Sequence, residues 1–90
     1  MHLKAKITGR VQMVRYRLFV KKNADKLYIL GSVQKLPDGR VLVDAYGEKF
    51  NLVDFLGILN KGSFLSRVDD IEQIWDNMEY EGEKEFKIIR

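Results

Sequence analysis

The stretch that decides the fold reads GRVQMVRYR and spans Gly9 to Arg17. It follows an alternating apolar and polar segment, Leu3–Ile7, and precedes apolar residues spaced as on one face of a helix. A glycine-bounded turn between a strand and a helix can direct several backbone N–H groups at one point. Because oriented amides at a helix start carry partial positive charge, this turn favours an anion the size of phosphate. The alternative is a basic turn that binds nothing.

Hydrophobic spacing predicts two helices. The first carries Tyr16, Val20, Ala24 and Leu27 on one face, and the second carries Leu52, Phe55, Leu56 and Leu59 and ends near Gly62. Both sets recur with the helical period, which is typical of helices packed on one side. Gly57 lies inside the second helix and is expected to weaken it.

Strands are predicted from alternation and from turn residues. Leu3–Ile7 alternates with period two, and Val41–Tyr46 does the same directly after Pro37-Asp38-Gly39. That tripeptide is a strong turn signal, so it should join a strand at Gly31–Val33 to the next strand as a hairpin. Two further strands are expected at Val68–Trp75 and Phe86–Ile89.

This order of elements predicts one α+β domain over residues 1–90. We expect a ferredoxin-like two-layer sandwich, βαββαβ with an added terminal strand, in which an antiparallel sheet carries both helices on one face. Phe50, Phe55 and Trp75 are expected in the core. Gln73 shares a predicted face with Ile71 and Trp75, and the pattern gives no reason for a polar residue there.

Composition narrows the classes of function. The chain has 90 residues, a formal net charge of +3, no cysteine and a single histidine, His2. A disulfide framework, a thiolate nucleophile and a zinc knuckle are therefore excluded, and we expect His2 at the surface and no metal site. No apolar run approaches the length of about 20 residues that spans a membrane, and no signal-peptide core is visible, so we expect a cytoplasmic protein without a membrane partner.

The first loop resembles the phosphate-binding loop of the acylphosphatase family, which has the form G-R-V-Q-G-V-x-F-R. The family's second signature, G-W-V-x-N, is matched in position by Gly31-Ser32-Val33-Gln34-Lys35. The likeness runs nearly end to end, with weaker support from Lys61-Gly62, Ser66–Asp69 and Phe86-x-Ile88.

This resemblance implies hydrolysis of the carboxyl–phosphate bond of small acyl phosphates without a metal or organic cofactor. It implies that Arg17 binds the phosphate, that a residue at position 35 orients the attacking water, and that loop amides surround the phosphate oxygens. Those amides belong to Gln12, Met13, Val14, Arg15 and Tyr16. The expected ligands are a small acyl phosphate or inorganic phosphate, and we expect a monomer.

Four positions depart from the family pattern, and Lys35 matters most because it replaces the asparagine. A side-chain amide both accepts and donates hydrogen bonds, whereas an ammonium group only donates. Lys35 is therefore expected to attract a phosphate dianion but to orient water poorly, which predicts tight anion binding with slow turnover. Met13 replaces a loop glycine, Ser32 replaces a tryptophan, and Tyr28 replaces a glycine after the first helix.

Three functions compete at this stage. The chain is either an acylphosphatase with reduced turnover or a non-catalytic phosphate- or anion-binding relative, and the sequence leaves open whether it is an enzyme. Nucleic-acid binding is disfavoured, because the first strand has no aromatic residue for base stacking. Arg10 is expected to fix the loop or to be solvated, and Arg15 is expected to lie at the surface. Asp69 and Asp70 are adjacent in a strand and should face opposite ways, so they form no acid–base pair.

Overall fold

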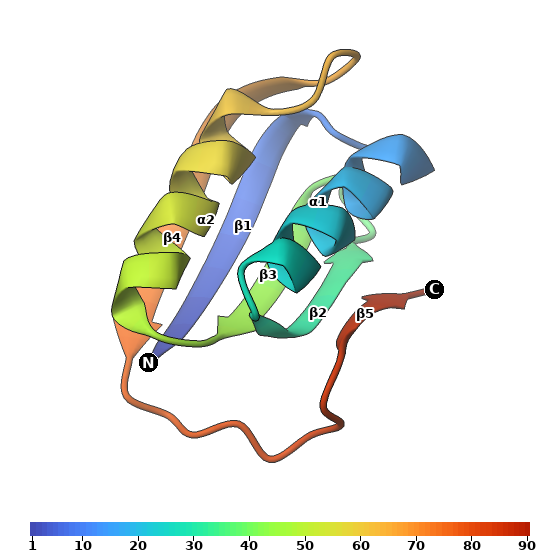
Figure 1. The fold of residues 1–90 in the computed structure, drawn as a ribbon. Helices are drawn as coiled ribbons and strands as arrows, with labels where there is room; N and C mark the ends of the chain where they lie inside the picture. The colour runs from blue at the N-terminus through green and yellow to red at the C-terminus, as the bar shows by residue number, and fades with distance from the viewer.

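The computed structural model describes residues 1–90 as one layer of strands covered on one face by two helices (Figure 1). The elements in chain order are β1 (His2–Arg10), α1 (Val14–Lys26), β2 (Leu30–Lys35), β3 (Val41–Tyr46), α2 (Lys49–Lys61), β4 (Arg67–Asp76) and β5 (Phe86–Ile89). This is the order expected from the sequence, and it confirms the α+β sandwich. Neither helix is long and apolar enough to cross a membrane.

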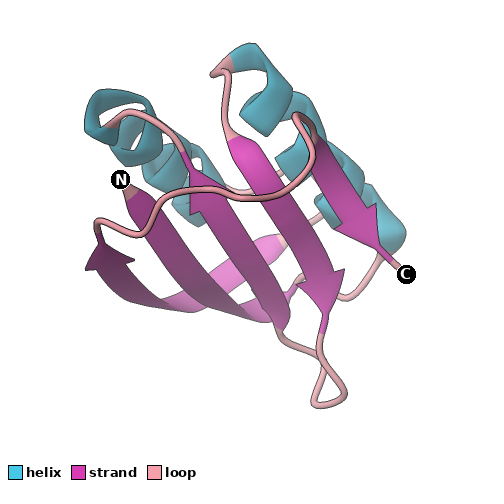
Figure 2. Ribbon diagram, turned by 90° about the horizontal axis from the view of Figure 1, so that it is seen from below, coloured by secondary structure: helices cyan, strands magenta, loops and turns pink.

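The sheet has the strand order β4-β1-β3-β2-β5. The three pairs formed by β4, β1, β3 and β2 are antiparallel, as expected. The expectation of a wholly antiparallel sheet is wrong at the edge, because β5 pairs with β2 in parallel. A long connection after β4 crosses the ends of the strands and reaches the far edge of the sheet, where β5 runs parallel to β2 (Figure 2). The Lys21 ammonium of α1 donates to the Phe86 carbonyl oxygen at 2.7 Å and so ties the helix to β5.

The core lies between the sheet and the helices. Leu3, Ala5 and Ile7 alternate along β1 and are fully buried, as the period-two pattern predicted. The helices contribute Tyr16, Val20 and Ala24 from α1 and Leu52, Phe55 and Leu59 from α2. Each large apolar side chain buried in this way stabilises the fold by about 1.5–3 kcal/mol.

Two aromatic residues expected in the core behave differently from Phe55. Phe50 is 77% exposed, so that expectation is wrong. It lies two residues before Leu52, about 200° around the helix axis, and therefore faces away from the sheet. Trp75 is partly buried against the core at the edge of the sheet. Its indole N–H donates to the Gln73 side-chain oxygen at 2.7 Å, which accounts for the polar residue on this face.

His2 also differs from expectation, because only 4% of its surface is exposed. The ring stacks on Tyr46, with ring centroids 4.3 Å apart. β1 begins at His2 itself, between β3 and β4, so the side chain lies among residues of neighbouring strands rather than on a frayed end.

The end of α1 contains the backbone position that the family glycine would fill. The amide of Ile29 donates to the Ala24 carbonyl and the amide of Tyr28 to the Asp25 carbonyl, which is the Schellman pattern of helix ends. Tyr28 has φ 56°, in the left-handed region that favours glycine, and its side chain is 86% exposed. The tyrosine therefore carries a conformational cost that burial of its ring does not offset.

We expect Tyr28→Gly to raise the free energy of unfolding by roughly 0.5–1 kcal/mol, because glycine adopts a positive φ without strain. Chemical denaturation would measure this as a higher midpoint with an unchanged slope. Tyr28→Ala is the matched control, since it removes the ring but keeps the strain. Equal stability of the glycine and alanine variants would contradict the argument.

Candidate functional site

The loop between β1 and α1 begins where β4 presses closest on β1. Gly9 has φ +143°, and a Cβ built on it would lie 2.1 Å from the carbonyl oxygen of Arg67. The pairing of β1 with β4 shifts register between Thr8 and Gly9. Only glycine fits at this position, and the shift lets the chain leave the strand and turn towards α1.

The start of α1 presents unpaired amide groups. Met13 is the N-cap residue, and no side chain caps this end of the helix. The Tyr16 N–H donates to the Met13 carbonyl at 3.1 Å, while the N–H groups of Gln12 and Met13 donate to no main-chain carbonyl. The first amides of a helix have no acceptor within the helix and carry partial positive charge. With no acidic residue in the first turn, this end is suited to an anion.

Arg17 lies at the same loop. Its Nη2 donates to the Gln12 carbonyl oxygen at 3.4 Å, so the guanidinium turns towards the loop rather than away from it. Its Nε is buried and has no hydrogen-bond partner in the protein. Buried donors in native proteins nearly always have partners, and an oxyanion is the kind of acceptor that a guanidinium holds best.

Gln12 connects the loop to the turn between β2 and β3. Its side-chain amide donates to the Gly9 carbonyl at 2.9 Å. A Cβ built on Gly39 would lie 3.4 Å from the Gln12 Nε2, so the turn packs directly on this side chain. The loop and the turn between β2 and β3 therefore meet in space, and Gln12 is the residue between them.

The turn itself is held by its own residues. The Leu36 N–H donates to the Arg40 carbonyl at 2.7 Å, and the Arg40 N–H donates to the Asp38 carboxylate at 3.0 Å. The hydrogen bond from the Arg40 N–H, together with the Arg40 guanidinium, holds the pKa of Asp38 below its usual value. The sequence signalled the turn through Pro37-Asp38-Gly39 but did not reveal the role of Arg40.

Lys35 is the last residue of β2. It pairs with Val41, which in turn pairs with Ile7 on β1, so Lys35 lies at the end of the sheet from which the loop departs. Lys35 shares a face of β2 with Gly31 and Val33, and this face of the strand is the one that faces the helices. Its side chain is exposed and forms no ion pair. No direct hydrogen bond joins Lys35 to Arg17.

The remaining loop residues divide into exposed and structural groups. The side chains of Arg10, Val14 and Arg15 are exposed. The role expected of Val14 and Arg15 in the loop is that of their backbone amides, which does not depend on their side chains. Tyr16 is buried and its hydroxyl donates to the Leu59 carbonyl at 3.1 Å, which fixes α1 against α2. Burial raises the pKa of the Tyr16 phenol. Its side chain therefore serves the fold, and its backbone belongs to the loop.

Comparison with known proteins identifies relatives over nearly the whole chain. The sequence profile described as Acylphosphatase matches residues 3–88. An acylphosphatase of Thermus thermophilus is 47% identical over 73 residues, which cover 81% of this chain and 83% of the relative. The crystal structure of acylphosphatase from Bacillus subtilis superposes with a TM-score of 0.91 at 35% identity and covers 99% of this chain and 98% of that one. An acylphosphatase from Coxiella burnetii gives a TM-score of 0.86 at 25% identity, with 98% and 90% covered.

The backbone at Met13 does not require glycine. Its φ is −71° and its ψ 144°, an extended conformation that any residue adopts, and the side chain is 60% exposed. The loop therefore accepts a side chain at this position without backbone strain.

We therefore expect Met13→Gly to lower the free energy of unfolding by about 0.4–1 kcal/mol relative to Met13→Ala, because glycine makes the unfolded chain more flexible at a position where it relieves no strain. Thermal and chemical unfolding of the two variants would measure the difference. A glycine variant more stable than the alanine variant would show that the methionine strains the loop.

Proposed function

Because this chain belongs to the acylphosphatase family, we propose that it hydrolyses the carboxyl–phosphate bond of small acyl phosphates, with turnover reduced by Lys35. The observation that carries the proposal is the buried, unpartnered Nε of Arg17 beside an uncapped helix start. A guanidinium and several backbone amides that converge on one point form a suitable site for a tetrahedral anion.

In the proposed reaction, the phosphoryl oxygens accept hydrogen bonds from Arg17 and from the amides of residues 12–16. Water attacks phosphorus, the bond between phosphorus and the acyl oxygen breaks, and the carboxylate leaves with its electron pair. The products are a carboxylate and inorganic phosphate. Arg17 and the amides act by stabilising charge on the phosphoryl oxygens, and water orientation is the remaining requirement.

Lys35 supplies that last requirement poorly. Its ammonium group has three donors and no acceptor, so it cannot accept a hydrogen bond from the attacking water as an amide oxygen can. It can instead add a positive charge at the end of the sheet where the loop begins. The expected result is stronger binding of phosphate together with slower chemistry.

The second candidate is a phosphate- or anion-binding protein without catalysis. The same substitution favours it, since Lys35 strengthens anion attraction and removes the amide. The two candidates differ in turnover alone, because both require Arg17 to hold the anion.

We expect Arg17→Ala to weaken binding of inorganic phosphate by about tenfold or more, because one charge-assisted contact is lost. Calorimetric titration with phosphate would measure it, and Lys22→Ala, on the exposed face of α1, is the matched control for loss of one positive charge. Absence of binding heat at millimolar phosphate for the unaltered protein would contradict both candidates.

We expect hydrolysis of benzoyl phosphate to be faster with the unaltered protein than with Arg17→Ala, and Lys35→Asn to raise kcat by up to about 10²–10³-fold. The amide restores an acceptor for water, whereas Lys35→Ala removes the charge without supplying one. The alanine variant should therefore bind phosphate less tightly without a gain in kcat. If the unaltered protein binds phosphate but hydrolyses no faster than Arg17→Ala, the non-catalytic candidate stands.

A further inference from the structure

His2 lies on the face of the sheet that the helices leave open, at the end of the strands away from the phosphate loop. Its Nδ1 is 2.9 Å from the Asp76 carboxylate at the end of β4, and its Nε2 contacts the Asp44 carboxylate of β3. The ring stacks nearly parallel on Tyr46, with an interplanar angle of 20°. One buried ring therefore joins three strands.

The two contacts indicate how many protons the His2 ring carries. A neutral imidazole has one N–H and one acceptor nitrogen, whereas an ionised carboxylate only accepts. The Met78 N–H donates to Asp76 and, with His2, holds the pKa of that carboxyl below its usual value, so Asp76 stays ionised. Both ring nitrogens can donate only when the ring is protonated.

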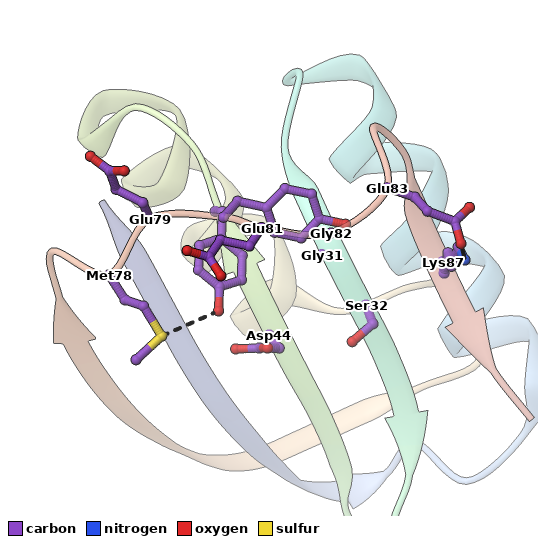
Figure 3. Close-up of a pocket in the computed structure, with 11 residues that line it drawn as sticks. Gly31, Ser32, Asp44, Met78, Glu79, Glu81, Gly82, Glu83 and Lys87 are labelled. Carbon is purple, nitrogen blue, oxygen red and sulfur yellow. Dashed lines mark hydrogen bonds and ion pairs between the residues drawn. The ribbon is translucent and has the colours of Figure 1, made fainter.

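The same residues secure the connection between β4 and β5, which we call the strap (residues 77–85). The Oδ1 of Asp76 accepts from both His2 and Met78. The Tyr46 hydroxyl donates to the Met78 sulfur at 3.7 Å, a contact visible in Figure 3, and its ring lies 5.0 Å from that of Tyr80. The start of the strap is therefore attached to residues that His2 orders.

We infer that His2 is a buried imidazolium that orders the residues to which the strap is attached, and that loss of its ring proton loosens the strap. A hollow of about 670 Å³ lies between strap and sheet, lined by Asp44 and Tyr46 on one side and by Met78 and Tyr80 on the other. Because one wall of this hollow is the strap itself, its shape follows the protonation of His2.

The charged neighbours define the direction of the pH response. The groups around the ring and its partners are the Met1 amino group, Lys4 on β1, Asp44 and Tyr46 on β3, Asp76 on β4, and Glu79 and Tyr80 on the strap. The two contacts together require a protonated ring, because a neutral ring has one N–H and can donate to only one of the two carboxylates. Loss of the ring proton at higher pH therefore removes one of the two contacts. They also require ionised Asp76, whose lowered pKa preserves them until the pH falls below the ordinary carboxyl value of about 4. The strap is fastened between these limits.

Because His2 is the only histidine, NMR of the intact protein can follow its ring without ambiguity. The ring carbon and nitrogen shifts are recorded against pH, together with hydrogen-exchange protection factors for Met78 and for Val20 in α1. We expect protection at Met78 to fall about tenfold over the pH interval in which the ring loses its proton, as for one lost charge-assisted hydrogen bond. Protection at Val20 should not change there. Constant protection at Met78 while the ring titrates would overturn the inference.

Two variants separate the proton from charge alone. His2→Gln keeps one amide donor and cannot gain a second charge-assisted bond, so its protection at Met78 should be low and flat with pH above pH 5. Lys4→Gln removes a nearby positive charge but no hydrogen bond to Asp76, so it should keep the transition. A transition that persists in His2→Gln would also overturn the inference. Neither measurement depends on the proposed hydrolysis.

Discussion

The close approach of β4 to Gly9 is the constraint on which the rest of this structure depends. The Arg67 carbonyl oxygen occupies the space that a side chain at position 9 would need. The pairing of β1 with β4 shifts register at this contact, and after β1 ends at Arg10 the chain turns into α1. A side chain at position 9 would collide with the Arg67 carbonyl oxygen, so the backbone could not take its present path from β1 into the loop.

Charge is handled differently at the two ends of the sheet. At the end of the sheet that carries the loop between β1 and α1, Arg10, Arg15 and Lys35 are exposed cations without carboxylate partners, and a helix start adds partial positive charge. At the other end, His2 is buried between Asp44 and Asp76. Burying a charge is costly unless it is paired and hydrogen-bonded, and these two carboxylates meet that need. One end leaves its positive charges exposed, while the other pairs its charges within the protein.

The departures from the family pattern have different structural consequences. Met13 has an extended backbone, so its side chain is accommodated without strain. Tyr28 occupies a left-handed position at the end of α1 and affects stability far from the loop. Lys35 exchanges a side chain that both accepts and donates for one that only donates, at the end of β2.

The sequence by itself determined the elements, their order and the loop, because alternation, helical spacing and turn residues act over a few neighbouring positions. It also marked Arg17 and Lys35 by resemblance. Only the tertiary structure decided that β5 joins β2 in parallel, that Phe50 faces water, that Gln12 packs against the turn at Gly39, and that His2 is buried. These depend on contacts between residues far apart in the chain, and no local pattern encodes which strand or side chain will lie beside another.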